Sequence, residues 1–194
     1  MAGLKEIFLT TRTEILNNLV LYQDYKGNDV KVLTCEMWNE QYIEQETGNE
    51  RSFRYPAIFI DFPEEIEYES LGAGLVETDN LTIRFVFVME YFKPRSTAIP
   101  ENLDIFDART AIIKKFAQFN PPTTAAKNAF TFITDRRNTN NNNLWVWEFD
   151  FKCWYREESG YVDQDLIEVI GVDIETQQTL KIDNDQIRTA KNFD

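Results

Sequence analysis

Apolar residues recur every three or four positions near the start of the chain. Over residues 3–22 they alternate with charged and polar side chains, which is the spacing of one face of an α-helix. The stripe consists of Leu4, Phe8, Thr11, Ile15, Leu19 and Tyr22. This pattern predicts an amphipathic helix over residues 3–22 whose apolar face packs on a core. A turn is expected at residues 26–29 (KGND), followed by a strand over residues 30–38.

Three further strands are predicted from longer apolar patterns. Residues 55–62 (YPAIFIDF) form a continuous apolar run with a proline at its second position, which suits the start of a strand. Residues 80–92 and 144–156 show a period of two, as expected for antiparallel strands with one buried face. The buried positions would be Leu81, Ile83, Phe85, Phe87, Met89 and Tyr91, and then Trp145, Trp147, Phe149, Phe151, Cys153 and Tyr155. The other face of the last strand should be wet or at an interface, since it carries Glu148, Asp150, Lys152 and Arg156.

A second helix is predicted between the two alternating strands. Pro100 and Asn102 mark its start, and Pro121-Pro122 lies beyond its end. Its apolar stripe consists of Ile105, Ala108, Ile112, Phe116 and Phe119. A short strand over residues 130–137 and a polar hairpin tip over residues 138–143 follow, whereas residues 39–54 are polar and predict a loop. The order α-β-β-β-α-β-β favours an α+β fold, with an antiparallel β-sheet and two helices packed on one face.

The composition changes at residue 157. Residues 157–194 hold ten acidic and three basic side chains, a net charge of −7, and alternate only weakly around residues 176–178. Two interpretations remain open for this stretch: an acidic arm that docks on a neighbour or on its own domain, or an extra hairpin of the same sheet. The predicted division is therefore an α+β domain over residues 1–156 and a C-terminal β arm or hairpin over residues 157–194.

The overall composition excludes several classes of protein. The chain has 194 residues, which suits one domain, and its four Trp, eight Tyr and fifteen Phe predict an aromatic-rich core. The complete absence of histidine removes Ser-His-Asp and Cys-His nucleophilic sites and zinc sites with histidine ligands. Two cysteines cannot build a disulfide framework, so Cys35 and Cys153 are expected to be reduced thiols on strands.

The charge balance argues against binding to nucleic acid, and the distribution of apolar residues argues against a membrane span. Twenty basic and thirty-three acidic side chains give a net charge of −13, which repels phosphate backbones. The chain has no apolar run of about 20 residues, the length of a membrane span. Charged residues interrupt the first 22 positions, which therefore lack the apolar stretch of a signal peptide. We expect a soluble protein made in a cytoplasm.

Clusters of acidic residues raise the question of a metal site. Glutamates gather after the 55–62 strand, close to Asp61, at Glu64, Glu65, Glu67 and Glu69. Their spacing does not match a calcium-binding EF-hand loop, which favours a solvated acidic loop. Asp150, Lys152 and Asp135 match part of a two-metal nuclease motif, but the net charge would repel the substrate. We therefore expect neither enzymatic activity nor a bound cofactor or metal.

The remaining short motifs also favour a structural role. Gly72-Ala73-Gly74 is followed by neither a further glycine nor a Lys-Ser or Lys-Thr pair at the spacing of a phosphate-binding loop. Residues 69–79 are therefore expected to form a flexible loop of the kind that lies at a subunit interface or lines a pore. The basic pairs Arg136-Arg137 and Lys114-Lys115 are either ordinary surface charges or partners in salt bridges between subunits.

The order of these segments resembles that of bacteriophage tail terminator proteins, also called tail completion or neck proteins. The resemblance covers residues 3–156 and rests on the order of the elements: the leading helix, YPAIFIDF, the acidic loop with its glycines, TIRFVFVMEYF, the second helix and the hairpin FTFITDRRNTNNNNLWVWEFDFKCWY. It implies a small α+β domain that assembles into a ring, commonly a hexamer, which caps the tail tube and joins it to the head connector. The loop at 39–54 and the arm at 157–194 depart from the family pattern and leave open which ring of the neck or tail is formed.

The resemblance implies a structural virion protein assembled in the cytoplasm of the host bacterium. Its partners would be further copies of itself, in a ring of six or twelve, and neighbouring portal, connector, tail tube or other neck proteins. An acidic channel would let DNA pass without sticking, because like charges repel. We expect Glu69, Glu77 and Asp79 in the channel or at an interface, and Arg136 and Arg137 facing a partner.

An alternative is a protein-binding module of the immunity type. Such a protein would be monomeric or dimeric and would use its acidic surface to neutralise a basic partner. A metal-dependent nuclease is a third hypothesis, which would require activity that responds to magnesium or manganese.

Overall fold

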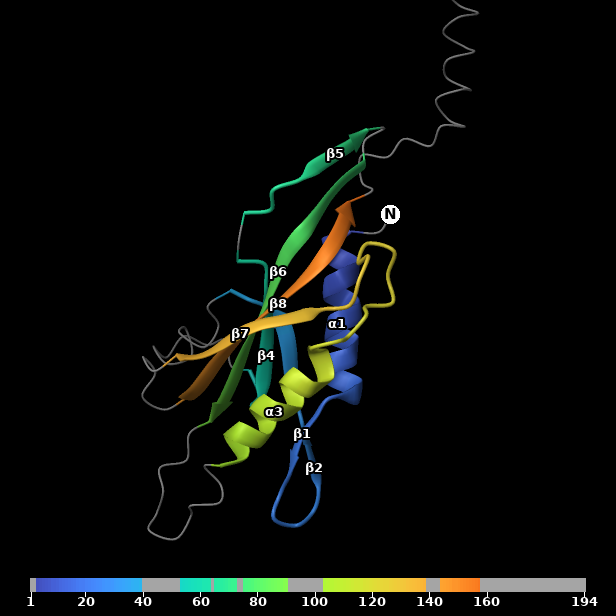
Figure 1. The fold of residues 1–194 in the computed structure, drawn as a ribbon. Coiled ribbons are helices and arrows are strands. Elements are labelled where there is room, and N and C mark those ends of the chain that lie inside the picture. Colours follow the sequence, from blue (N-terminus) through green and yellow to red (C-terminus); the bar gives the residue numbers. More distant parts are fainter. Residues whose placement is uncertain are drawn as a thin grey trace, which may run out of the picture.

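The fold was analysed in a computed structural model, which describes residues 3–39, 53–63, 65–72, 75–90, 103–138 and 144–157. Its elements are α1 (Leu4–Asn18), β1 (Val20–Gln23), β2 (Asp29–Lys31), β3 (Thr34–Met37), β4 (Ala57–Asp61), β5 (Glu69–Gly72), β6 (Leu75–Glu90), α3 (Asp104–Phe116), β7 (Thr131–Asn138) and β8 (Leu144–Glu157). Six strands form one sheet in the order β3-β4-β6-β8-β7, with β5 added along β6. Both helices and the small β1–β2 hairpin lie on one face of this sheet (Figure 1). The predicted α+β class is confirmed.

The first helix ends earlier than its apolar spacing predicts. It stops at Asn18, and Leu19 already has extended backbone angles of φ −88° and ψ 112°. The chain then enters β1, whose hairpin with β2 closes through Asp24, because its Oδ1 atom accepts the backbone N–H groups of Lys26 and Asn28 at 2.8 and 2.9 Å. Leu19 of the predicted stripe is still buried although it precedes β1, whereas Tyr22 lies on β1 and is only partly buried.

The predicted strand over residues 30–38 is two strands in different sheets. Residues 29–31 pair with β1, whereas β3 pairs with β4 in parallel, with Cys35 opposite Ile58. The main sheet is therefore mixed at this edge rather than wholly antiparallel, which corrects the prediction. The sequence of a short strand does not indicate whether its partner is parallel or antiparallel, because side chains alternate with a period of two in both arrangements.

The predicted flexible loop over residues 69–79 is also wrong. Residues 69–72 form β5, and residues 75–79 are the first part of β6, so the two segments make an antiparallel hairpin. Gly72 has φ +83° at the end of β5, a conformation that side chains with a Cβ rarely adopt. In Figure 1 β5 lies beside the first part of β6, at one end of the sheet. Glu, Ser and Gly are poor strand formers, which is why pattern alone did not indicate the strand.

The main core lies between the helices and the sheet. The predicted stripes of α3, β6 and β8 meet there, with Phe85 at ring-centroid distances of 5.0 Å from both Phe116 and Phe151. The polar face of the sheet also carries an apolar cluster at one end, built from Ala57, Phe59, Val86, Val88, Leu144 and Val146. Simple alternation missed this second cluster, because residues 85–88 (FVFV) are apolar on both faces of the strand.

Several predictions can be checked only in part. Cys35 in β3 and Cys153 in β8 are free, buried thiols, and burial raises the pKa of each to about 12.

Other predictions concern residues that the structure does not describe. These are residues 40–52 of the predicted loop, 139–143 of the hairpin tip and 158–194 of the C-terminal stretch, together with Tyr91, Pro100 and Asn102. Whether residues 157–194 form an arm or a hairpin thus stays a prediction. Among the described residues, no helix is both long and apolar enough to cross a membrane.

One buried polar group in α1 makes a testable prediction about stability. The Thr11 side chain is fully buried, and its hydroxyl has no hydrogen-bond partner within the described structure. Because an unpaired buried hydroxyl costs about 1–3 kcal/mol, Thr11→Val should raise the free energy of unfolding by about 1 kcal/mol in urea denaturation. The matched control is Thr13→Val on the exposed face of the same helix, which should stay within about 0.5 kcal/mol of wild type. A clear loss of stability in Thr11→Val would contradict the prediction.

Candidate functional site

An acidic groove lies at the end of the sheet formed by β5, β6 and β8. It has a volume of about 730 Å³, and its acidic lining consists of Glu65, Glu67, Glu69, Glu77 and Asp79. Tyr68 and Trp154 contribute aromatic rings to the same groove, with 41% and 38% of their surface exposed. The structure therefore brings together three residues that the sequence singled out: Glu69, Glu77 and Asp79.

The carboxylates of the groove differ in how their charge is compensated. Glu69 on β5 lies directly opposite Glu77 on β6, a like-charged pair that is unfavourable without a cation. Arg156 on β8 supplies one, since its guanidinium binds the Glu77 carboxylate at 3.0 Å. Within the described part of the chain, neither Glu69 nor Asp79 has a cation in salt-bridge contact. The groove therefore retains exposed negative charge at these two positions.

The carboxylates of the acidic groove were also considered as possible metal ligands. No group of three or more Cys, Asp or Glu residues among the described ones is placed to hold a metal ion. Asp61 belongs to a different part of the sheet, where it lies opposite Arg84, and Glu64 is outside the described residues. Of the glutamates considered for calcium from the sequence, Glu65, Glu67 and Glu69 line the acidic groove.

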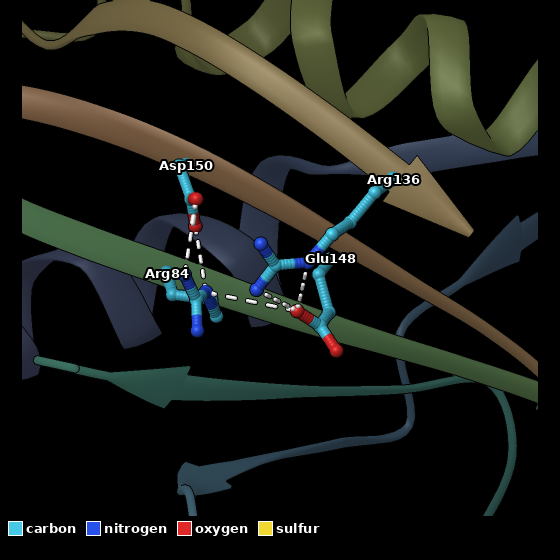
Figure 2. A network of polar contacts seen from close by, with 4 residues as sticks. All are labelled: Arg84, Arg136, Glu148 and Asp150. Carbon is cyan, nitrogen blue, oxygen red and sulfur yellow. Dashed lines mark hydrogen bonds and ion pairs between the residues drawn. The ribbon is translucent and has the colours of Figure 1, made fainter. Parts of the chain in front are cut away.

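The face of the sheet away from the helices carries an ordered network of charges (Figure 2). Arg84 on β6 donates two hydrogen bonds to Asp150 on β8, at 2.7 and 3.1 Å, and lies 3.8 Å from Glu148. Arg136 on β7 binds the same Glu148 carboxylate at 2.6 Å. Glu148 and Asp150 have only 15% and 14% of their side chains exposed. These two carboxylates are thus mostly covered within the chain rather than wet, and whether this face lies at an interface stays a prediction.

The contacts on this face shift the pKa values of Arg84 and Asp61. The hydrogen bond to Asp150 raises the pKa of Arg84 above its ordinary value, because the charged guanidinium is the form that the bond stabilises. Burial raises the pKa of Asp61, although nearby Arg84 acts in the opposite direction. Cations and carboxylates thus alternate across β4, β6, β8 and β7, which holds the charged side chains in fixed positions.

The two neighbouring arginines of β7 serve opposite faces of the sheet. Arg136 joins the charge network, whereas the Arg137 guanidinium stacks over the Trp145 ring at 3.6 Å from its centroid. This division follows from the two-residue period of a strand. Arg137 is exposed, and no carboxylate among the described residues pairs with it. It is the better candidate of the two for contact with a partner.

Sequence reasoning missed the environment of Asp135. Its carboxylate accepts two hydrogen bonds from Arg109 on α3, at 2.6 and 2.8 Å, and one from the Trp147 indole at 2.7 Å. The bonds from Arg109, followed by the one from Trp147, lower the pKa of Asp135. Asp135 therefore points toward the helices, while Asp150 binds Arg84 on the other face of the sheet. The two carboxylates considered for a nuclease do not share a site.

Comparisons with known proteins add no identification. A scan against models of protein families finds no match, and neither does a search of curated proteins.

The opposite environments of two aspartates predict opposite effects of pH on stability. At pH 7, Asp135→Asn should lower the free energy of unfolding by about 1–3 kcal/mol, because it weakens charge-assisted bonds. The folded-state pKa of Asp135 is lowered from 3.8, so its contribution is present above 3.8 and is lost as pH falls through the folded value. The loss in free energy of unfolding caused by Asp135→Asn should therefore become smaller at acidic pH.

The control is Asp61→Asn. Burial raises the pKa of Asp61 above 3.8, so its ionised form disfavours folding at neutral pH; this penalty shrinks as pH falls through the folded pKa and is gone below 3.8. Asp61→Asn should therefore not lower the free energy of unfolding at pH 7. Urea denaturation of both variants and of wild type between pH 3 and pH 7 measures how each substitution changes the free energy of unfolding. If this change depends on pH in the same way for both variants, the opposite environments of Asp135 and Asp61 are contradicted.

Proposed function

We propose that the protein is a structural component of a bacteriophage virion that forms an oligomeric ring in the neck or tail. In this role it would join head to tail or terminate the tail, with a channel through which DNA passes. The proposal rests on the element order that resembles tail terminator proteins, and on an exposed sheet edge and charged surfaces that are suited to contact with other chains.

One observation carries the proposal: β7 lies at the edge of the sheet and presents an exposed strand. It follows β8 in the sheet order, and no strand among the described residues pairs with its outer side. An edge strand has unpaired backbone groups, which invite another chain to add to the sheet. Exposed arginines at 136 and 137 disfavour unspecific pairing of this edge and favour a partner with negative charge.

The charge of the chain supports a role around DNA. A net charge of −13 on each copy would make the wall of a ring strongly acidic. Such a wall repels the phosphate backbone and allows the duplex to slide through.

The ring predicts a native mass that is a multiple of the chain mass. Light scattering on a sizing column should give six or twelve times 22.9 kDa, and negative-stain images of the same peak should show closed rings. Phage connector or tail tube proteins would be added if the purified chain is monomeric, since some rings close only on their partner. A chain that stays monomeric with those proteins would contradict the proposal.

The acidic channel predicts weak affinity for DNA. Wild-type protein should leave the fluorescence anisotropy of a labelled duplex unchanged at physiological salt, because association would bring like charges together. Its matched control is the same titration with a basic protein of similar mass. Tight binding of the duplex by the wild-type ring would contradict the proposed role of the negative charge.

A second candidate is an acidic module that binds and neutralises a basic partner protein. The acidic groove favours it, since Glu69 and Asp79 are exposed and have no cation beside them in the described structure. Such a module would be monomeric or dimeric and would pair with a cationic protein without forming rings. The native mass therefore separates the two candidates.

A further inference from the structure

The far end of the sheet from the acidic groove carries a surface built from guanidinium groups and aromatic rings. It consists of Phe106 and Arg109 on α3, Arg137 on β7, and Trp145 and Trp147 on β8, which we call the arginine–tryptophan surface. Arg137 lies over Trp145, Arg109 lies 5.6 Å from the Trp147 ring centroid, and the Phe106 ring packs edge-on against Trp147 at 6.0 Å. Arginine and tryptophan are the residues most enriched at the energetic centres of protein interfaces.

The arginines of this surface are held in place in different ways. Arg109 is neutralised by its two hydrogen bonds to Asp135. Arg137 has no such carboxylate among the described residues, and its stacking on Trp145 leaves the edge of the guanidinium open to hydrogen-bond acceptors. A stacked guanidinium loses little freedom on binding, so it is prepared to receive a carboxylate.

Exposed apolar side chains extend the same surface. Phe106 is 50% exposed and the neighbouring Leu103 is 53% exposed, although most apolar residues of α3 are buried. The partner should therefore offer carboxylates for Arg137 together with apolar or aromatic groups for α3. The acidic groove combines these two properties, since Glu69 and Asp79 lie beside Tyr68 and Trp154.

The two surfaces cannot meet within one chain. Trp145 belongs to one surface and Trp154 to the other, and they are nine residues apart on the single strand β8. At about 3.3 Å per residue, this separation is about 30 Å along a strand that pairs with β6 over this span and with β7 from Val146 to Lys152. Figure 1 shows the β5 end and the β7 end at opposite extremes of the sheet. Any contact between them must join two copies.

We propose that the arginine–tryptophan surface of one copy docks in the acidic groove of the next copy, with Arg137 facing the carboxylates of Glu69 and Asp79. The inference deepens the proposed ring and rests on it. Because two different surfaces meet, the contact is head-to-tail, and repetition of such a contact produces a closed ring or an open filament rather than a symmetric dimer.

A second copy fits the chemistry better than a nucleic acid. Arg137 could also receive a phosphate, but the net charge of −13 repels a polyanion from the rest of the molecule. The same chain carries both the cationic surface and the anionic groove, so each copy supplies the partner that the next one needs.

Charge reversal on each side tests the contact. The variants are Arg137→Glu on the arginine–tryptophan surface, and Glu69→Lys or Asp79→Lys in the groove. Each variant alone should weaken self-association at least tenfold in sedimentation velocity over a concentration series, because like charges then meet at every contact. An equimolar mixture of Arg137→Glu with a groove variant should recover assembly, since alternating copies restore opposite charges at both kinds of contact.

The control is Lys114→Glu, which reverses an exposed charge on α3 that lies outside both defined surfaces. It should assemble like wild type, and circular dichroism should confirm that all variants are folded. If wild type forms rings while all three reversed variants assemble equally well, the proposed contact is wrong and the ring stands. If neither mixture recovers assembly, the contact is also overturned. A wild-type chain that stays monomeric at the highest concentration and with phage partners overturns both proposals.

Discussion

The antiparallel pairing of β6 with β8 is the interaction on which the rest of the structure depends. It runs from Val76 opposite Glu157 to Glu90 opposite Leu144, and it brings together the two longest strands of the sheet. β4 and β5 add to β6, and β7 adds to β8, so every other strand of the main sheet except β3 is positioned by one of these two. The same pairing also spans the distance between the acidic groove and the arginine–tryptophan surface.

The two faces of this pair are stabilised by different means. Toward the helices, aromatic rings from β6, β8 and α3 pack into one continuous core. On the other face, Arg84 and Asp150 lie opposite each other in register and form a bidentate ion pair, which Glu148 and Arg136 extend to β7. Such a network contributes less to stability than apolar packing, but it fixes which charged groups remain available to a partner. Arg136 is engaged in it, whereas Arg137 is left to stack on Trp145.

This division of charges links the fold to the proposed assembly. Among the described residues, no cation compensates Glu69 and Asp79 at one end of the sheet, and no carboxylate compensates Arg137 at the other end. A rigid sheet with opposite charges at its two ends favours head-to-tail association. The edge strand β7 lies next to the cationic end, so the same contact would also shield its outer side from other chains.

The sequence by itself determined the class of the fold and most of its buried face. The stripe of α3 and the alternation of β6 and β8 predicted most of the buried residues, because local periodicity reports which side of an element faces the core, whereas Trp145 and Trp147 are only partly buried. The resemblance to tail terminator proteins, together with their charge, also brought Glu69, Glu77, Asp79, Arg136 and Arg137 to attention. The end of α1 was predicted too late, since Leu19 and Tyr22 continue the helical spacing although the backbone is already extended at Leu19.

Only the tertiary structure decided which of these charges are paired. Arg156 neutralises Glu77 from 79 positions away, and Arg84 meets Asp150 across 66 positions. Strand order and register determine such contacts, and neither can be predicted from the spacing of residues along the chain. The same reason explains the parallel pairing of β3 with β4, the hairpin of β5 and the separation of Asp135 from Asp150 onto opposite faces. Composition shows how much charge a chain carries, but only its folded contacts determine where that charge remains free to act.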